Sequence, residues 1–177
     1  MNIKKLPVII SFAITLILLF GGWHMYHSYA LQSPLTERIN SLDGVIRAEA
    51  TVEPDTVHIT LQLAPDASLR HIMQAIRSEG ASHIKDRELV VRIDHPPAPL
   101  LEEWWQSVLF DIAEAMETKN YSAIPDILEQ KKSKFDELEA TAEIDDQYVY
   151  IRLVHKDQAK FVMLPRIPPQ LAGWSNA

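Results

Sequence analysis

The chain has 177 residues, with 17 Lys and Arg against 24 Asp and Glu, which gives a net charge of −7 at pH 7. This acidic balance argues against nucleic acid as a partner and against adhesion to anionic lipid headgroups, because both need clustered basic side chains. The chain has no cysteine, which excludes disulfides, thiolate metal sites, a cysteine nucleophile and a cysteine-linked lipid.

The most apolar part of the sequence is residues 6–23, which carry no charged side chain and follow Lys4 and Lys5. A helix of this length reaches about 27 Å, close to the thickness of the hydrocarbon core of a bilayer. We therefore predict a transmembrane helix over residues 6–23 that acts as a signal anchor. Basic residues mark the cytoplasmic end of such a span. We expect residues 1–5 in the cytoplasm and the bulk of the chain outside the cell membrane.

A cleaved signal peptide is the alternative for the same segment, with the cut near Ala30. Two observations favour a retained anchor. The apolar run is longer than the central region of most signal peptides, which has about 7–15 residues. The bulky residues from Trp23 to His27 suit a membrane interface, where Trp and Tyr gather, better than a cleavage site.

A proline-rich stretch at residues 96–99 divides the exported part into two units, residues 33–95 and residues 100–167. Proline fixes its own backbone angle and lacks an N–H group, so we expect an extended linker here. Residues 168–177 are expected to form a flexible tail.

The first unit reads as helix, strand, strand, helix, strand. Alternating apolar and polar residues indicate half-buried strands, and Pro, Asp and Gly mark the helix ends. The expected elements are a helix from Ser33, strands at 45–52 and 57–63, a helix that opens at Pro65 and closes at Gly80, and a strand at 89–93.

This order, together with the sequence Leu42-Asp43-Gly44-Val45 that leads into the first strand, resembles the small αββαβ modules of exported assembly proteins. The ring-building motif of secretion and sporulation channel proteins is one such family, and the BON domain is another. The resemblance implies a module that stacks beside copies of itself or lies against membrane and wall partners. The glycines typical of BON strands are missing from this chain.

The second unit reads as two helices followed by an antiparallel meander. The expected helices cover residues 100–116 and 126–134, and the expected strands cover residues 138–144, 148–154 and 159–164. With the sequence of residues 116–128, METKNYSAIPDIL, this order resembles NTF2-like modules. The predicted fold class is therefore α+β, with an N-terminal transmembrane helix, an αββαβ unit and a helix-plus-antiparallel-meander unit.

Phe110 is the candidate residue for partner binding. On a helix it lies beside Glu103 and Glu114 and away from the apolar stripe. An aromatic side chain on a polar face is either covered by another element or offered to a partner, and the sequence leaves both possibilities open.

A pocket between the long helix and the meander is a second candidate site. A curved meander against an apolar helix can enclose a ligand. Four aromatic side chains are the possible lining of that pocket: Trp104, Trp105, Tyr148 and Tyr150.

No motif for catalysis or metal binding stands out. The seven histidines show no HExxH spacing, and His24 and His27 lack a third ligand nearby. The sequence contains no GxSxG motif and no glycine-rich phosphate loop, the usual signs of nucleophilic or phosphate chemistry. We predict no enzymatic activity, no catalytic residue, no cofactor and no bound metal.

These features together predict a single-pass, membrane-anchored extracytoplasmic protein that scaffolds, assembles or regulates a cell-envelope complex. Its expected partners are the lipid bilayer, through residues 6–23, and another protein or a second copy of the chain. One alternative is an extracytoplasmic ligand- or signal-binding module. Another is an enzyme whose site is not visible in the sequence.

Overall fold

The computed structural model describes residues 11–12, 14–19, 33–132, 135 and 137–167. Within them, helices combine with two three-stranded sheets, which confirms the predicted α+β class. None of the helices in this described part has both the length and the apolar character needed to cross a bilayer. Most of the predicted span at residues 6–23 and the predicted tail at residues 168–177 lie outside the described residues, so both stay predictions.

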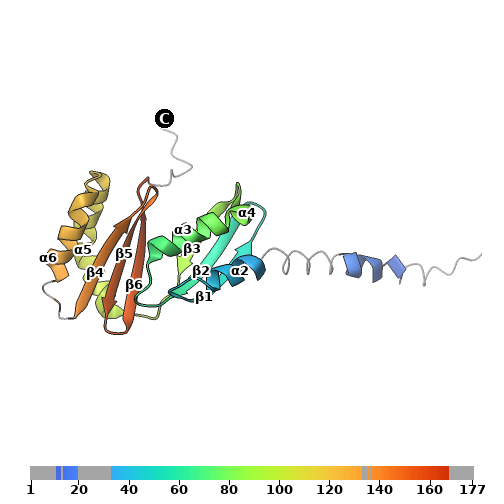
Figure 1. Cartoon of the computed structure of the whole chain (residues 1–177), viewed down its shortest axis with the longest axis horizontal. Coiled ribbons are helices and arrows are strands. Elements are labelled where there is room, and N and C mark those ends of the chain that lie inside the picture. Colours follow the sequence, from blue (N-terminus) through green and yellow to red (C-terminus); the bar gives the residue numbers. More distant parts are fainter. Residues whose placement is uncertain (1–10, 13, 20–32, 133–134, 136, 168–177) are drawn as a thin grey trace, which may run out of the picture.

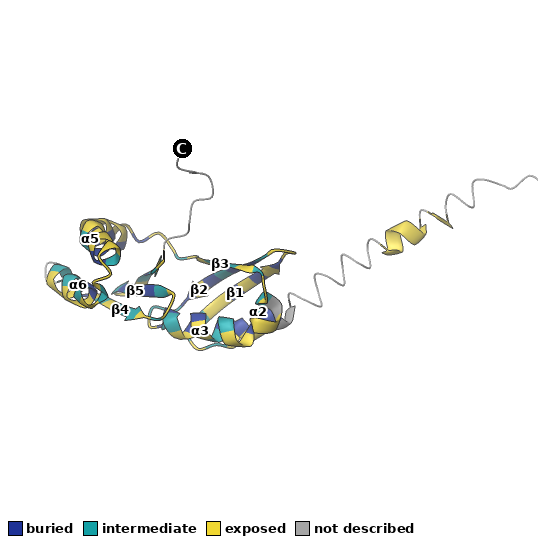
Figure 2. Cartoon of the chain, turned by 90° about the horizontal axis from the view of Figure 1, so that it is seen from above, coloured by how far each residue is buried: buried dark blue, intermediate teal, exposed yellow. Residues whose placement is uncertain are grey.

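The first unit is a three-stranded sheet with helices on one side (Figure 2). Its strand order is β1-β2-β3, with β1 and β2 antiparallel and β2 and β3 parallel. The helix α3 and the short α4 make the crossover between the two parallel strands. The elements in chain order are α2 (Ser33–Asn40), β1 (Val45–Val52), β2 (Thr56–Leu63), α3 (Leu69–Glu79), α4 (Ala81–Ile84) and β3 (Glu88–Ile93).

The turn between α2 and β1 requires glycine. Gly44 has φ +81°, and a Cβ at this position would lie 2.7 Å from the Cβ of Ala67. The Gly44 carbonyl also accepts a hydrogen bond of 2.9 Å from Ala64 N–H. This close approach keeps residues 64–67 out of a helix. The prediction that α3 opens at Pro65 is therefore wrong, and the helix begins at Leu69 with the Ser68 side chain as its cap.

The two edges of this sheet differ. Side chains of α2 close the outer edge of β1: Asn40 bonds both backbone groups of Ala48, at 2.7 and 3.2 Å, and the Thr36 hydroxyl accepts from Ala50 N–H at 3.3 Å. In the described residues no comparable bond reaches the outer edge of β3. The first sheet thus has one covered edge and one open edge.

The second unit confirms the predicted order of helices and meander. Its sheet is fully antiparallel, with order β4-β5-β6. Pro125 lies in the first turn of α6, so that helix begins at Ile124, two residues before the predicted start. The elements are α5 (Pro99–Glu117), the 3-10 turn η1 (Tyr121–Ala123), α6 (Ile124–Lys132), β4 (Leu138–Ile144), β5 (Tyr148–His155) and β6 (Gln158–Pro165).

The second sheet is buried on both faces. Val149, Ile151 and Leu153 pack against α5 and α6, whereas Tyr150 and Phe161 join the core of the first unit. Figure 1 shows the resulting stack, with α5 and α6 at one end, the second sheet next, and α3 with the first sheet beyond it. Each unit therefore has its own apolar cluster, and the meander separates the two clusters.

The predicted linker lies against this body. Pro99 is the first residue of α5, and Ala98 is buried within the cluster under that helix. Residues 94–98 have no regular secondary structure. Pro96 and Pro97 therefore lie between β3 and α5, whereas Pro99, which was expected in the linker, begins the helix. Ala98 fixes the start of α5 on the second unit.

Candidate interaction surface

One face of α5 is buried and the other is open to solvent. The buried residues recur every three or four positions, as an amphipathic helix requires, and they are Leu101, Trp104, Trp105, Val108, Ile112 and Ala115. This face rests on the second sheet, which fixes the direction of the opposite face. The residues there are exposed because no described element covers them.

Phe110 lies on the open face, and its side chain is 85% exposed. The alternative that another element buries Phe110 is therefore wrong for the described structure. Exposing a phenyl ring forgoes about 1.5–3 kcal/mol of the stabilisation that burial would give. Single exposed apolar residues are common on protein surfaces, so the surroundings of Phe110 decide its interpretation.

Those surroundings are acidic. Glu103, Glu114 and Glu117 lie seven residues before, four after and seven after Phe110, so all three project from the same side of the helix. Within the described structure no cation lies within ion-pair distance of these three carboxylates. We call Glu103, Phe110, Glu114 and Glu117 the acidic face of α5.

The other two carboxylates of α5 have partners. Lys160 bonds Glu102 at 2.6 Å and keeps the pKa of that carboxyl below its ordinary value. Lys131 pairs with Asp111 at 2.9 Å. These two ion pairs tie α5 to β6 and to α6. The acidic face is therefore the part of the α5 charge that the fold does not neutralise.

An apolar groove runs beside Phe110, between α5 and the end of β6. It has a volume of 370 Å³, and its apolar lining consists of Leu109, Ile112, Ala113, Met116, Leu164 and Pro165. Three charged residues, Glu117, Lys119 and Arg166, complete the lining. Ala113, three residues after Phe110, is its neighbour on the helix surface, so the groove lies next to the ring, although Phe110 itself does not line it. Sequence reasoning missed this groove because residues about fifty positions apart form it, and no local pattern signals such a contact.

The four aromatic residues predicted to line a pocket do not come together. Trp104 and Trp105 are buried in the cluster beneath α5. Tyr148 and Tyr150 point to the opposite face of the meander, where their ring centroids lie 6.1 Å apart against the first unit. β5 thus separates the two pairs, and the helix side of the sheet is a packed core.

A polar network joins the two units instead. The Tyr150 hydroxyl donates to Asp145 at 2.6 Å, and Arg77 of α3 donates to the same carboxylate at 3.0 Å. Partial burial by itself would raise the pKa of Asp145, but these bonds and those from the backbone of Gln147 and Tyr148 outweigh burial and lower the pKa to about 2. Burial and the bond to Asp145 raise the pKa of Tyr150.

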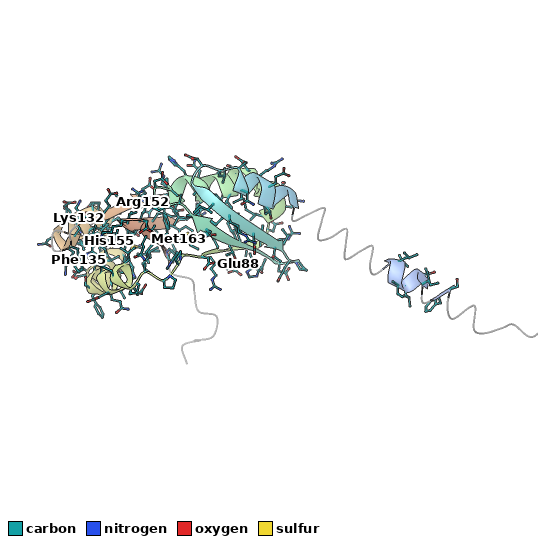
Figure 3. The ribbon with its side chains drawn as sticks, turned by 90° about the horizontal axis from the view of Figure 1, so that it is seen from below. Glu88, Lys132, Phe135, Arg152, His155 and Met163 are labelled. Carbon is teal, nitrogen blue, oxygen red and sulfur yellow. The ribbon has the colours of Figure 1, made fainter. Side chains whose placement is uncertain are left out.

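Further contacts strengthen the same junction. Ser68 donates to Glu143 at 2.9 Å, and Arg152 donates to the carbonyl of Pro65 at 3.1 Å. Figure 3 shows Arg152 and Met163 where the second sheet meets the first unit. An open hollow of 610 Å³ borders Arg77 and Asp145. Because these two charges already neutralise each other, the hollow is best explained as the margin of the junction.

The described residues contain no group of three or more His, Asp or Glu side chains placed to hold a metal ion. His24 and His27 lie outside the described residues. Neither a protein-family model, nor a curated protein, nor a solved structure matches this chain. The functional argument therefore depends on the geometry of the chain itself.

Proposed function

We propose that this chain is a single-pass, membrane-anchored extracytoplasmic protein without catalytic activity, which scaffolds, assembles or regulates a cell-envelope complex through the acidic face of α5. The observation that carries the proposal is the 85% exposure of Phe110 among three carboxylates that no described cation neutralises. The resemblance of residues 33–95 to exported assembly modules is part of the same proposal.

The N-terminal segment supports the anchoring part of the proposal. Residues 11–12 and 14–19 are helical, and the large apolar side chains among them are 37–70% exposed. Figure 1 draws these turns apart from the folded body. Apolar side chains at such density need a covering medium, because water is an unfavourable environment for them. A bilayer is that medium in our proposal, with Lys4 and Lys5 on its cytoplasmic side.

Phe110 has the properties of an interface anchor. Aromatic side chains are enriched among the residues that dominate binding energy, and surrounding contacts that exclude water strengthen them. The neighbouring apolar groove gives a partner further surface to bury. A partner that covers Phe110 and fills the groove would recover the free energy that the isolated chain forgoes.

The charge of α5 indicates the chemistry of the partner. The helix has five carboxylates and no Lys or Arg, so it attracts cations and repels a second acidic surface. We propose a protein segment that carries an apolar side chain flanked by Lys or Arg. The charges would steer the encounter, whereas the apolar contact at Phe110 would set the lifetime of the complex.

Crosslinking in intact cells tests this proposal. The full chain and its Phe110→Asp variant are crosslinked, captured and analysed by mass spectrometry. We expect the variant to lose the crosslinked protein partners at least about tenfold, because removing an anchoring aromatic costs about 2 kcal/mol or more. Raising the salt concentration in a binding assay with the identified partner should weaken the complex further.

Ile46→Asp is the matched control, because Ile46 is another large apolar residue, 61% exposed, on β1 of the first unit. This control should keep the partners that Phe110→Asp loses. Circular dichroism should give the same folded signal for both variants. If folded Phe110→Asp captures the same partners as the unchanged chain, the acidic face of α5 is not the interface.

A further inference from the structure

The outer edge of β3 is the open edge of the first sheet. In the parallel pairing with β2, Glu88 N–H bonds to Asp55 and Asp94 N–H bonds to Leu61, at 2.9 and 2.8 Å. Alternate residues of a strand direct their backbone groups to opposite sides. The N–H and C=O groups of Leu89, Val91 and Ile93 therefore point away from β2, and none bonds to another described residue. A row of such groups is a template for another strand.

The side chains of β3 divide in the same way between two faces. Leu89, Val91 and Ile93 turn towards the apolar cluster of the first unit and are partly buried. Glu88, Val90 and Arg92 are exposed on the helix-free face (Figure 3 labels Glu88). The side chains of Glu88 and Arg92 have no partner among the described residues. Four residues along a strand separate them by about 13 Å, so they cannot pair with each other.

These two unpaired charges are complementary to those of a second copy. In an antiparallel pair of β3 strands with Val90 opposite Val90, Glu88 of each copy lies opposite Arg92 of the other. Leu89 then lies opposite Val91, and both present outward-pointing backbone groups, as a hydrogen-bonded pair requires. Opposite charges in facing positions stabilise such a pair.

Other registers lack this match. A shift of one strand by one residue would place residues whose backbone groups point towards the partner opposite residues whose backbone groups point towards β2. Such a register cannot form the ladder of hydrogen bonds. A slip by two in one direction places Glu88 opposite Asp94, and in the other direction places it opposite Val90. The first places two carboxylates opposite each other. The second leaves Glu88 opposite Val90 and brings Arg92 opposite Asp86, which lies in the turn before β3 and outside the strand.

We propose that the outer edge of β3 is a self-association site, at which two copies of this chain join their first sheets into one six-stranded sheet. The two β3 strands pair antiparallel at the centre of that sheet. The contact is isologous, as in most two-fold dimers. Because β3 has only six residues, we expect a modest affinity in solution. Attachment of both copies to one membrane would raise their effective concentration. The β1 edge, closed by Asn40 and Thr36, does not compete for this role.

A single cysteine at the two-fold axis tests the pairing, since the natural chain has none. Val90 is 39% exposed, so Val90→Cys does not disturb the core. Facing residues in a non-hydrogen-bonded antiparallel pair have Cα atoms about 4.5 Å apart, within the range of about 4.4–6.8 Å for a disulfide. We expect the full chain with Val90→Cys, purified in mild detergent, to form a disulfide dimer under a mild oxidant.

His58→Cys is the matched control. His58 faces the same side of the sheet and is the β2 neighbour of Val90 in the register. In the proposed dimer, three strand spacings of about 4.8 Å separate the two copies of this position, too far for a disulfide. The control should therefore stay monomeric on oxidation.

Charge reversal tests the register. In the Val90→Cys chain, Glu88→Arg or Arg92→Glu replaces two attractive pairs with two repulsive ones, and we expect each to weaken dimerisation about tenfold. The double reversal restores opposite charges and should restore the crosslink. Sedimentation of the cysteine-free chain and the same charge variants gives a second readout that does not depend on the cysteine.

Two results would overturn the proposal: equal crosslinking of Val90→Cys and His58→Cys, or single reversals that leave the dimer unchanged. Crosslinking of Val90→Cys to a different polypeptide in cells, without the homodimer, would assign the edge to that protein and also overturn it. The β3 edge is separate from the acidic face of α5. A failure here therefore leaves the Phe110 experiment unaffected, and the reverse also holds.

Discussion

Asp145 connects the two units through one carboxylate. It accepts hydrogen bonds from Tyr150 and Arg77 on one oxygen and from the backbone of Gln147 and Tyr148 on the other. The backbone bonds fix the turn between β4 and β5. The Arg77 bond holds α3 against that turn. The side chain thus stabilises a local turn and a contact between residues 68 positions apart.

We predict a pH dependence of stability from this residue. The pKa of Asp145 is lowered from 3.8 to about 2 in the folded chain, so its contribution is fully present above pH 4 and is lost as the pH falls through 2. Partial solvent exposure weakens the effect, and we expect a loss of about 1–2 kcal/mol. Urea unfolding from pH 4 to pH 2 measures it. Asp145→Asn should lack this loss, whereas Asp146→Asn, at an exposed position in the same turn, should retain it.

At the scale of residues, the local sequence predicted part of the arrangement around Asp145. The strands predicted at residues 138–144 and 148–154 leave a turn at residues 145–147, and the turn is present. The partner Arg77 was not predicted, because nothing local to residue 145 indicates which helix will pack against it. Phe110 shows the same division: its helix position was readable from the sequence, but its exposure depended on how the meander and the first unit were placed.

At the scale of elements, periodicity located every strand of the two sheets to within one residue at each end. Strand alternation is a direct consequence of burying one face. The errors fall where tertiary contacts override local signals. α3 starts late because Ala67 packs on Gly44, and the short α4 follows a glycine that was expected only to end a helix. β5 carries apolar residues on both faces, and only the packing assigns each face to a unit.

The acidic face of α5 lowers the stability of its own helix. Glu114 and Glu117 lie in the last turn, at the negative end of the helix dipole, and no basic residue accompanies them there. We therefore expect Glu114→Lys to raise the free energy of unfolding by about 0.3–1 kcal/mol. The same change should reduce capture of the proposed basic partner.

Glu79→Lys is the control for this prediction. Glu79 is exposed in the last turn of α3, so the dipole argument gives a similar gain in stability, but the residue lies outside the acidic face. Thermal unfolding and crosslinking of both variants separate the two effects. Equal partner capture by Glu114→Lys and Glu79→Lys would contradict a functional role for the Glu114 charge.

At the scale of the whole molecule, the two ends of the body face different surroundings in our proposal. α2, which follows the N-terminal segment, lies at one end of the stack, and α5 and α6 lie at the other (Figure 1). The acidic face of α5 therefore lies at the end of the body opposite to α2, the described helix that follows the proposed anchor. A partner that binds Phe110 need not approach the membrane surface. The acidic residues around Phe110 would also repel anionic lipid headgroups.

The anchor itself gives the last prediction. If residues 6–23 span the bilayer and are retained, the protein purified from membranes should have the mass of the whole 177-residue chain, and a protease added outside the cell should digest the body but not residues 1–5.

Ile14 lies near the centre of the run, where an arginine costs about 2.5–3.5 kcal/mol of insertion free energy. Ile14→Arg should therefore shift the protein out of the membrane fraction, whereas Ile14→Leu should not. A mature protein that begins after Ala30 would instead identify the segment as a cleaved signal peptide, and the exported body would then act without a tether.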